Sequence, residues 1–345
     1  MMLHAAGTPD RASHETGETV LTVRDLCISL DRPGGALGIV RNLSFDIHAG
    51  EMVGLVGESG CGKTMTALTL MGLQSRNRSI VVEGSINLEG TDILRMNRRA
   101  LRQITGDRIS MIFQEPMSAL DPVFTIGEQI SEVVRAHRPI SRQEARHRAI
   151  EALAHVEIPD PARRYDAYPH QLSGGMRQRA MIAMAIVCEP RLLIADEPTT
   201  ALDVTIQAQI VELLRGLCRR TGMAVLLVTH DLGLVAQNCE RVLTMYAGEL
   251  VEEGDATSVL AHPGHPYTSG LMRAIPALMP RKSELITIPG RVPRLSEFPN
   301  GCRFEPRCGY AIPQCQASQD MRTGEGGHSA RCCRYPDLDL EGVWS

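Results

Sequence analysis

One eight-residue segment limits what this chain can fold into, and it reads Gly57-Glu58-Ser59-Gly60-Cys61-Gly62-Lys63-Thr64. It satisfies the pattern G-x-x-x-x-G-K-[ST], in which glycines let the backbone curl so that successive N–H groups surround a phosphate. A largely apolar run over 52–56 precedes the segment, and a helical pattern over 63–73 follows it. A strand, a glycine-rich loop and a helix in this order predict a phosphate-binding loop, for which a simple glycine-rich turn is the alternative.

Within this loop, Lys63 is expected to reach the β- and γ-phosphate oxygens, and the Thr64 hydroxyl is expected to face Mg²⁺. Lys63 and Lys282 are the two lysines of the chain, and every other basic residue apart from histidine is an arginine. The wide guanidinium fork of arginine does not replace a compact ammonium in a tight pocket. The retained lysine therefore supports the assignment of the loop.

A second short apolar run ends in two carboxylates. Residues 192–195 are apolar and lead directly into Asp196 and Glu197. Asp196, at the end of a buried strand, is the kind of residue that holds Mg²⁺ through water beside a phosphate loop. Glu197 is placed to polarise the attacking water as a general base. Many strands end in acidic turns, so the pair indicates catalysis only together with the phosphate loop.

Extended and helical patterns alternate along most of the chain, which predicts an α/β fold with a largely parallel sheet covered on both faces. Two extended segments between 20 and 47, separated by a Gly-Gly turn, predict an antiparallel pair. The other expected strands are 85–88, 108–113, 192–195 and 224–229.

Changes in residue pattern and composition divide the chain into regions. Ser141 and Glu144 form a capping-box pattern inside a helical stretch, and prolines recur beyond residue 276, where five of the ten cysteines lie between 302 and 333. We predict a disordered tail over 1–19, a nucleotide-binding domain over 20–275 with a helical insertion over 115–171, and a separate cysteine-rich module over 276–345.

Charge and hydropathy exclude several classes of protein. The formal net charge is −4, so no global basic field attracts nucleic acid, and we expect no nucleic-acid partner. Apolar stretches such as 181–188 fall short of the ~20 residues of a membrane-spanning helix. Asp10, Glu15 and Glu18 occupy the place of a secretory signal's apolar core. We therefore expect a cytoplasmic protein with reduced thiols.

Leu172-Ser173-Gly174-Gly175-Met176 resembles the signature sequence of ATP-binding cassette (ABC) transporters, which reads LSGGQ in its commonest form. A glycine pair that opens a helix, expected here over 176–187, presents N–H groups, and with them the Ser173 hydroxyl, to a phosphate. The resemblance implies a head-to-tail dimer. In it, the phosphate loop of one subunit and Ser173, Gly174 and Gly175 of the other hold each ATP.

Other motifs of this family follow in the expected order. Gln114 resembles the glutamine that touches Mg²⁺ and the attacking water, the segment 201–203 resembles the D-loop of the dimer interface, and His230 resembles the histidine that contacts the γ-phosphate. The resemblance implies ATP and Mg²⁺ as cofactors. It also implies catalytic roles for Lys63, Glu197 and His230, nucleotide binding by 57–64 and 173–175, and Mg²⁺ contacts from Thr64, Gln114 and Asp196.

The segments 114–122, 176–179 and 262–268 narrow the resemblance to ATP-binding subunits of bacterial oligopeptide/dipeptide importers. Such a subunit is a peripheral ATPase on the cytoplasmic face of the inner membrane. Its partners are two permease subunits, a second ATPase subunit that is a sister or an identical copy, and indirectly a periplasmic solute-binding protein. Residues 117–126 would face the permease. Related systems carry nickel, opines or glycosides, so the solute stays open.

One position departs from the family, because many members place an aromatic residue for adenine stacking where this chain has Leu30. Weaker selectivity for the base follows. Two other classes of function stay as alternatives: a non-transport ABC ATPase that acts on DNA or ribosomes, and a redox-responsive binding protein regulated by ATP.

The cysteines near the C-terminus suggest a metal centre, because clustered cytosolic thiolates in a region without its own core can bind a soft metal. Zinc and an iron–sulfur cluster both suit four thiolates, and thiols without metal are the alternative. The resemblance favours a 4Fe–4S cluster over zinc. Cys332 is preferred to Cys333 because its distance from His328 resembles the spacing in that family, so the expected ligands are Cys302, Cys308, Cys315 and Cys332.

Overall fold

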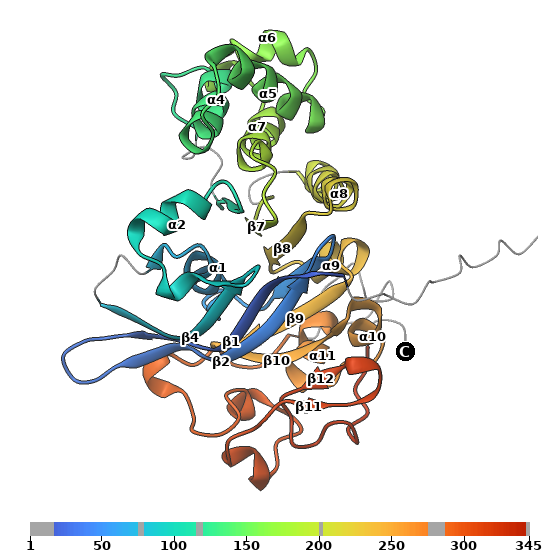
Figure 1. The fold of residues 1–345 in the computed structure, drawn as a ribbon. Coiled ribbons are helices and arrows are strands. Elements are labelled where there is room, and N and C mark those ends of the chain that lie inside the picture. Colours follow the sequence, from blue (N-terminus) through green and yellow to red (C-terminus); the bar gives the residue numbers. More distant parts are fainter. Residues whose placement is uncertain (1–16, 75–78, 115–119, 200–202, 275–286, 343–345) are drawn as a thin grey trace, which may run out of the picture.

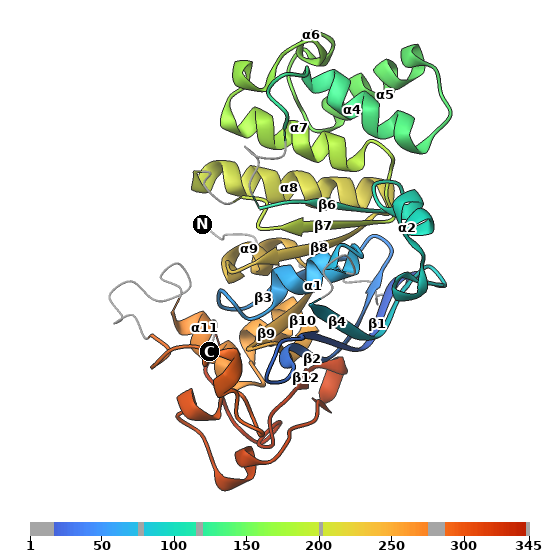
Figure 2. The ribbon, with the colours of Figure 1, turned by 90° about the vertical axis from the view of Figure 1, so that its left-hand side faces the viewer.

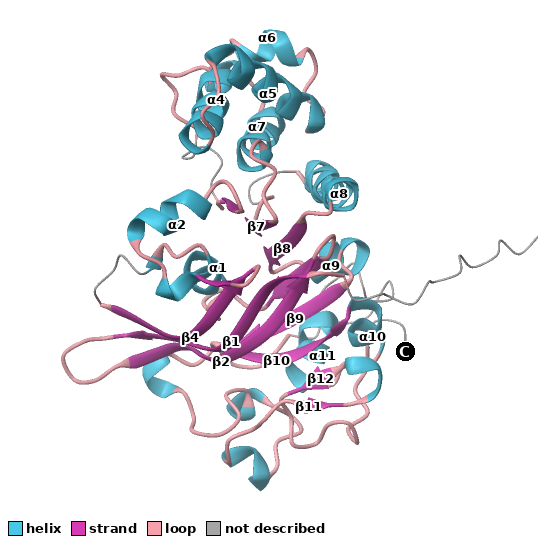
Figure 3. Cartoon of the chain, viewed as in Figure 1, coloured by secondary structure: helices cyan, strands magenta, loops and turns pink. Residues whose placement is uncertain are grey.

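The computed structural model describes residues 17–74, 79–114, 120–199, 203–274 and 287–342. Within these ranges two β-sheets lie together, helices cover the larger sheet, and a helical group stands above both (Figure 1; Figure 3). The larger sheet has the strand order β11-β12-β10-β9-β3-β8-β7-β6, and the smaller sheet has the order β2-β1-β4-β5.

Five neighbouring strands form the parallel centre of the larger sheet. They are β9 (Arg241–Tyr246), β3 (Met52–Val56), β8 (Ala224–Thr229), β7 (Leu192–Asp196) and β6 (Ile109–Ile112). Strand β3 pairs in parallel with β8 and β9, and β7 pairs in parallel with β8 and β6. Every residue of β3, β7 and β8 is buried, as expected for parallel strands covered on both faces. The predicted α/β class is confirmed.

The smaller sheet is antiparallel throughout. Strand β1 pairs with β2 and with β4, and β4 pairs with β5, which confirms the predicted antiparallel part of the fold. The bounds are β1 (Thr19–Leu30), β2 (Leu37–His48), β4 (Ile80–Leu88) and β5 (Thr91–Asp92). The tail predicted over 1–19 is wrong at its end, because Thr19 opens β1 and Glu18 forms an ion pair with Arg191. Residues 1–16 lie outside the described ranges.

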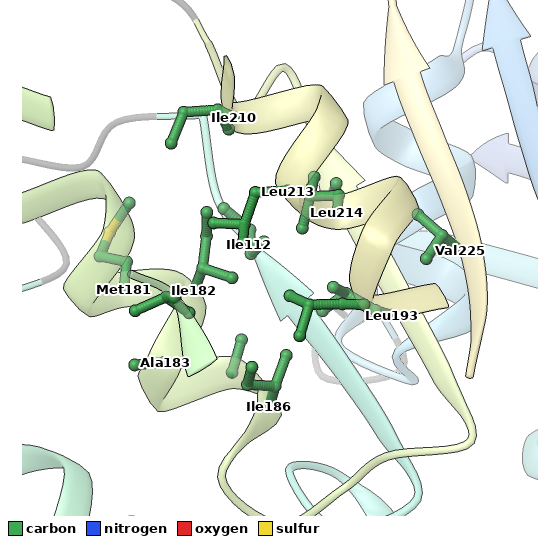
Figure 4. Packing of buried hydrophobic residues seen from close by; sticks show 14 of the residues in the cluster. Ile112, Met181, Ile182, Ala183, Ile186, Leu193, Ile210, Leu213, Leu214 and Val225 are labelled. Carbon is green, nitrogen blue, oxygen red and sulfur yellow. The ribbon is translucent and has the colours of Figure 1, made fainter. Parts of the chain in front are cut away.

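Alternate residues of the parallel strands point to opposite faces of the larger sheet. Leu55 and Ile194 belong to the core shared with the antiparallel sheet and helix α1 (Lys63–Leu70). Leu193 and Val225 belong to the other core, where they pack with helices α7 (Gly174–Ile186) and α8 (Val204–Thr221) (Figure 4). Helices α1 and α7 therefore lie on opposite faces of the sheet.

The helical group lies inside the predicted insertion and stands away from the strands (Figure 2). It contains α4 (Ile126–His137), α5 (Arg142–His155) and α6 (Pro161–Tyr165). Thr125 and Glu128 form a reciprocal capping box at the start of α4, and the Ser141 hydroxyl accepts a hydrogen bond from the Glu144 N–H at the start of α5. Side-chain oxygens at these positions satisfy N–H groups that have no partner within the helix.

The remaining helices join or flank the strands. They are α2 (Arg98–Ile104), α9 (Leu232–Asn238), α10 (Ala256–Ala261) and α11 (Pro266–Arg273). Among the described residues, no helix combines the length and the apolar character that crossing a membrane requires.

The C-terminal region, residues 287–342, is not the separate module that the sequence suggests. Strand β12 (Ser329–Ala330) pairs with β10 (Glu249–Asp255) and with β11 (Arg322–Thr323), which extends the larger sheet. Phe304 packs against Tyr246 and Tyr267, which lie outside the region. A segment with so few apolar residues buries them by packing on the domain before it.

Candidate functional site

The phosphate loop begins at a position that requires glycine. Gly57 has a φ of +152°, and a Cβ there would lie 2.2 Å from the Met245 carbonyl oxygen. Gly62, with a φ of +104°, is the N-cap of α1. The buried Lys63 ammonium donates to the Gly57 and Glu58 carbonyl oxygens at 2.6 and 3.2 Å. The loop therefore curls around its own lysine.

Thr64 and Asp196 lie together, as expected for two residues that share one Mg²⁺. The Thr64 hydroxyl donates to the Asp196 carboxylate over 3.3 Å. Asp196 is 2% exposed, and this burial raises the pKa of its carboxyl, while the Thr64 hydrogen bond opposes the rise. A divalent cation at this position would favour the ionised carboxylate.

Two residues assigned from separate motifs, Gln114 and His230, meet at Glu197. The Gln114 side-chain amide donates to the Glu197 carboxylate at 2.8 Å, and His230 Nδ1 lies 3.2 Å from its other oxygen. Glu197 has a φ of +45°, in the left-handed region that costs free energy for a residue with a side chain. Backbone strain at a strand end is typical of functional positions.

The topology of the sheet explains this convergence. Gln114 follows β6, Asp196 and Glu197 end or follow β7, and His230 follows β8. These strands and β3, which precedes the phosphate loop, are parallel neighbours. Ligands in open α/β sheets bind at the carboxyl ends of such strands.

The signature segment lies elsewhere. The Ser173 hydroxyl accepts a hydrogen bond from the Met176 N–H and caps α7, which begins at Gly174, two residues before the expected helix start. A Cβ on Gly174 would meet no atom within 4 Å, so packing within this chain does not require glycine there. The structure does not bring Ser173 to the phosphate loop, because α1 and α7 lie on opposite faces of the sheet.

One side-chain contact of helix α7 was not predicted from the sequence. The buried Gln178 side chain donates to the Pro198 carbonyl oxygen, just after Glu197. This contact links α7 to the catalytic strand end. Residues 201 and 202 of the predicted D-loop, and 117–119 of the predicted permease-facing segment, lie outside the described residues.

Four of the cysteines near the C-terminus line one small cavity together with Phe304, and these are Cys302, Cys308, Cys315 and Cys332. Cys333 instead places its sulfur 3.7 Å from that of Cys315. All are free thiols, and burial raises the pKa of Cys302 to about 12 and that of Cys308 to about 11. Within the described ranges, no three potential ligands converge closely enough for a single metal ion.

Glu58 makes contacts that its place in the loop motif did not predict. Its carboxylate forms a two-pronged ion pair with Arg307 at 2.7 and 3.1 Å. Its backbone N–H donates to the Tyr267 hydroxyl at 2.8 Å. A glutamate one residue after the first glycine, and an arginine beside a cysteine, give no separate sequence signal for this pair.

Leu30 is the residue expected beside the adenine base. Leu30 ends β1 between Leu37 of β2 and Ile80 of β4. Its role toward the base stays a prediction.

The phosphate loop, the acidic end of β7 and the signature segment at the start of α7 together define an ATP-binding protein of the ABC class. Comparison with known families supports this. The chain matches the family described as "ABC transporter" over residues 40–200 and the one described as "Oligopeptide/dipeptide transporter, C-terminal region" over residues 251–315. The chain belongs to the ABC-transporter family of ATP-binding subunits.

Individual relatives are similar over nearly the whole chain. A probable peptide ABC transporter ATP-binding protein, y4tR of Sinorhizobium fredii, is 47% identical over 94% of this chain and 98% of its own length. The oligopeptide transport ATP-binding protein OppD of Haemophilus influenzae is 46% identical over 91% of this chain and 96% of its own.

Solved structures share the fold over about two thirds of the chain. The ABC transporter cassette MJ0796, solved as a dimer with ADP and Pi, has a TM-score of 0.59 at 28% identity, over 68% of this chain and 98% of its own. CbiO1 from Clostridium perfringens, part of the transporter complex cbiONQ, has a TM-score of 0.61 at 26% identity, over 71% and 91%.

Proposed function

We propose that this chain is the ATP-hydrolysing subunit of a membrane importer for oligopeptides or dipeptides. The observation that carries the proposal is the meeting of Gln114, Glu197 and His230 beside the pair of Thr64 and Asp196. Family membership and the names of the relatives supply the transported class. Nickel, opines and glycosides are the alternative solutes.

The chemistry follows from the positions of the side chains. Lys63 would neutralise charge on the terminal phosphates, and Thr64, Asp196 and Gln114 would hold Mg²⁺. Glu197 takes the proton of the attacking water, with His230 and Gln114 fixing its carboxylate. Phosphoryl transfer needs little covalent help, so positioning and charge stabilisation provide most of the rate enhancement.

A second ATPase subunit completes each site in this proposal. Ser173, Gly174 and Gly175 of one subunit contact the ATP held by the phosphate loop of the other. Two observations support this arrangement: α1 and α7 lie on opposite faces of the sheet, and none of the described residues requires glycine at 174. The ATP then holds the two subunits together, and hydrolysis separates them.

The permease contacts are proposed at a groove between β6 and the helical group. Val133, His137 and Met184 line it, and Phe113 and Phe124 are 45% and 52% exposed beside it. Exposed aromatic side chains at an apolar groove indicate a protein contact. This contact would hold the subunit at the cytoplasmic face of the inner membrane, next to two permeases that receive solute from a periplasmic binding protein.

We further propose that Cys302, Cys308, Cys315 and Cys332 hold a 4Fe–4S cluster, with zinc as the alternative. The four cysteines line one small cavity together, which supports a shared site. When bound, the cluster would tie together segments that lack a core of their own. Iron, sulfide and zinc analysis after anaerobic purification tests this, and a metal-free protein would contradict both forms.

Uptake by cells tests the transported class. A strain that lacks the gene is given the wild-type chain or Glu197→Gln, and the import of labelled di- and oligopeptides is measured beside that of nickel, an opine and a glycoside. We expect the wild-type chain alone to restore peptide uptake. Restoration of another solute and not of peptides would overturn the assignment.

A further inference from the structure

We propose that Arg307 is a positioning residue for the phosphate loop, through which the C-terminal region sets the affinity for Mg-ATP. The inference rests on the proposed ATPase function and adds a residue to its site. Arg307 and Glu58 are 249 positions apart in the sequence, and they join the C-terminal region to the second residue of the loop.

The ion pair is partly buried, and both of its hydrogen bonds are formed. The Arg307 side chain is 5% exposed, and two of its nitrogens each contact a different oxygen of Glu58. The third nitrogen, Nε, donates to the Pro289 carbonyl oxygen at 2.9 Å. A two-pronged pair fixes direction as well as distance, which a lysine at the same place does not do.

The backbone of Glu58 is held from the same side. Its N–H donates to the hydroxyl of Tyr267, whose ring packs against Tyr246 with a centroid distance of 4.6 Å. The Tyr246 hydroxyl lies 3.4 Å from Arg307. Both tyrosines are fully buried. One residue of the loop is therefore fixed at its side chain and at its amide by a single packed group.

Fixing Glu58 also fixes the catalytic lysine. The carbonyl oxygens of Gly57 and Glu58 accept hydrogen bonds from the Lys63 ammonium. A rotation of the peptide at Glu58 would move these carbonyls and with them the ammonium that meets the phosphates. The ion pair therefore acts on the phosphates through the loop that contains Glu58.

The region that supplies Arg307 also provides a matched control. Arg303 lies four residues earlier, its side chain is 6% exposed, and it lies 3.4 Å from the buried carboxylate of Glu249. This pair, together with a hydrogen bond from Arg303 to the Ala247 carbonyl oxygen, joins the C-terminal region to β10 and to the turn before it without contacting Glu58. Loss of Arg303 thus reports what general loosening of the region does.

The experiment measures the Kd of Mg-ATP by calorimetry, and KM and kcat, for the full chain and for Arg307→Met, Arg307→Lys, Glu58→Gln and Arg303→Met. We expect Kd and KM to rise about tenfold in both Arg307 variants, within the usual range of coupling between sites, with kcat changed much less. Arg303→Met should bind as the wild type does. Arg307→Met combined with Glu58→Gln should bind better than Arg307→Met alone, because the partly buried site then holds no carboxylate without its partner.

Wild-type affinity in a folded Arg307→Met would overturn the proposal, and so would equal losses in the Arg303 and Arg307 variants. If Arg307→Met does not fold, Arg307→Lys, which keeps the charge and loses the fork, decides on the same criteria. Failure of the wild-type chain to bind Mg-ATP would instead contradict the proposed function. The two failures are therefore distinguishable.

Discussion

Polar side chains differ in their exposure between two regions of the larger sheet. At the carboxyl ends of β6, β7 and β8 they contact one another near the surface, and the His230 side chain is 66% exposed. Along β10 they are buried: the Glu252 side chain is 0% exposed and accepts hydrogen bonds from His328 and from the N–H groups of Gly264 and His265. Groups of the first kind can exchange partners during a reaction, whereas groups of the second kind hold the shape of the protein.

The largest effect is expected at the open strand ends. Glu197→Gln removes the proposed general base while keeping the side-chain size, and we expect the rate of ATP hydrolysis to fall by about 10²–10⁴-fold. Because binding is retained, ATP should trap the variant as a dimer, visible by gel filtration. Glu212→Gln, on the exposed side of α8, is the control. Normal hydrolysis by Glu197→Gln would contradict its role.

Much of this region could be predicted from the sequence because each residue is tied to a local pattern. Gln114, Asp196 and His230 each stand at or just after an apolar strand, and parallel strands bring such positions to one edge. Their spatial meeting at Glu197 then follows from the topology. The start of α7 at Gly174, two residues earlier than expected, could not be predicted from the sequence. Glycine is normally a poor helix residue, and here the first turn contains two.

The C-terminal region was less predictable, and the reason is physical. Strands β11 and β12 have two residues each, too few for a periodic pattern. The pair of Arg307 and Glu58 joins segments from opposite ends of the chain, and no local pattern marks either partner. Cysteine spacing indicated that Cys302 and its neighbours gather, but not that the region packs on Tyr246.

The second largest effect is expected on ATP binding by the phosphate loop. Lys63→Ala removes the ammonium expected at two phosphates, and hydrogen bonds to charged groups contribute about 1.5–3 kcal/mol each. We expect ATP affinity to fall by about 10²-fold or more, measured by calorimetry. Lys282→Ala, at the other lysine of the chain, is the matched control. Equal ATP binding by Lys63→Ala and the wild type would reject the phosphate loop.

The third prediction tests the buried region. Glu252→Gln leaves His328 and two N–H groups without their carboxylate, and the loss of a partner for buried hydrogen-bonding groups costs about 1–3 kcal/mol. We expect the free energy of unfolding in urea to fall by about this amount, while kcat at 25 °C stays close to that of the wild type.

The neighbouring Glu253 is the control for this loss. Burial raises the pKa of its carboxyl, so the ionised form at neutral pH is less favourable in the folded state than in the unfolded chain and costs stability. Glu253→Gln should therefore leave the stability unchanged or raise it. Equal destabilisation by both variants would show that the two glutamates do not differ as proposed.

The last prediction concerns Gly174, where a small effect on stability should accompany a clear loss of ATP-dependent dimerisation. A Cβ on Gly174 meets nothing within 4 Å, so Gly174→Ala should change the free energy of unfolding by no more than about 0.5 kcal/mol. If Gly174 faces the ATP of a second subunit, the added methyl group lies where backbone and phosphate meet. ATP-dependent dimerisation in the Glu197→Gln background should then weaken. Gly309→Ala, at a second glycine with open space, should leave dimerisation unchanged; if the two alanine variants dimerise equally well, the signature segment does not contact the nucleotide of the second subunit.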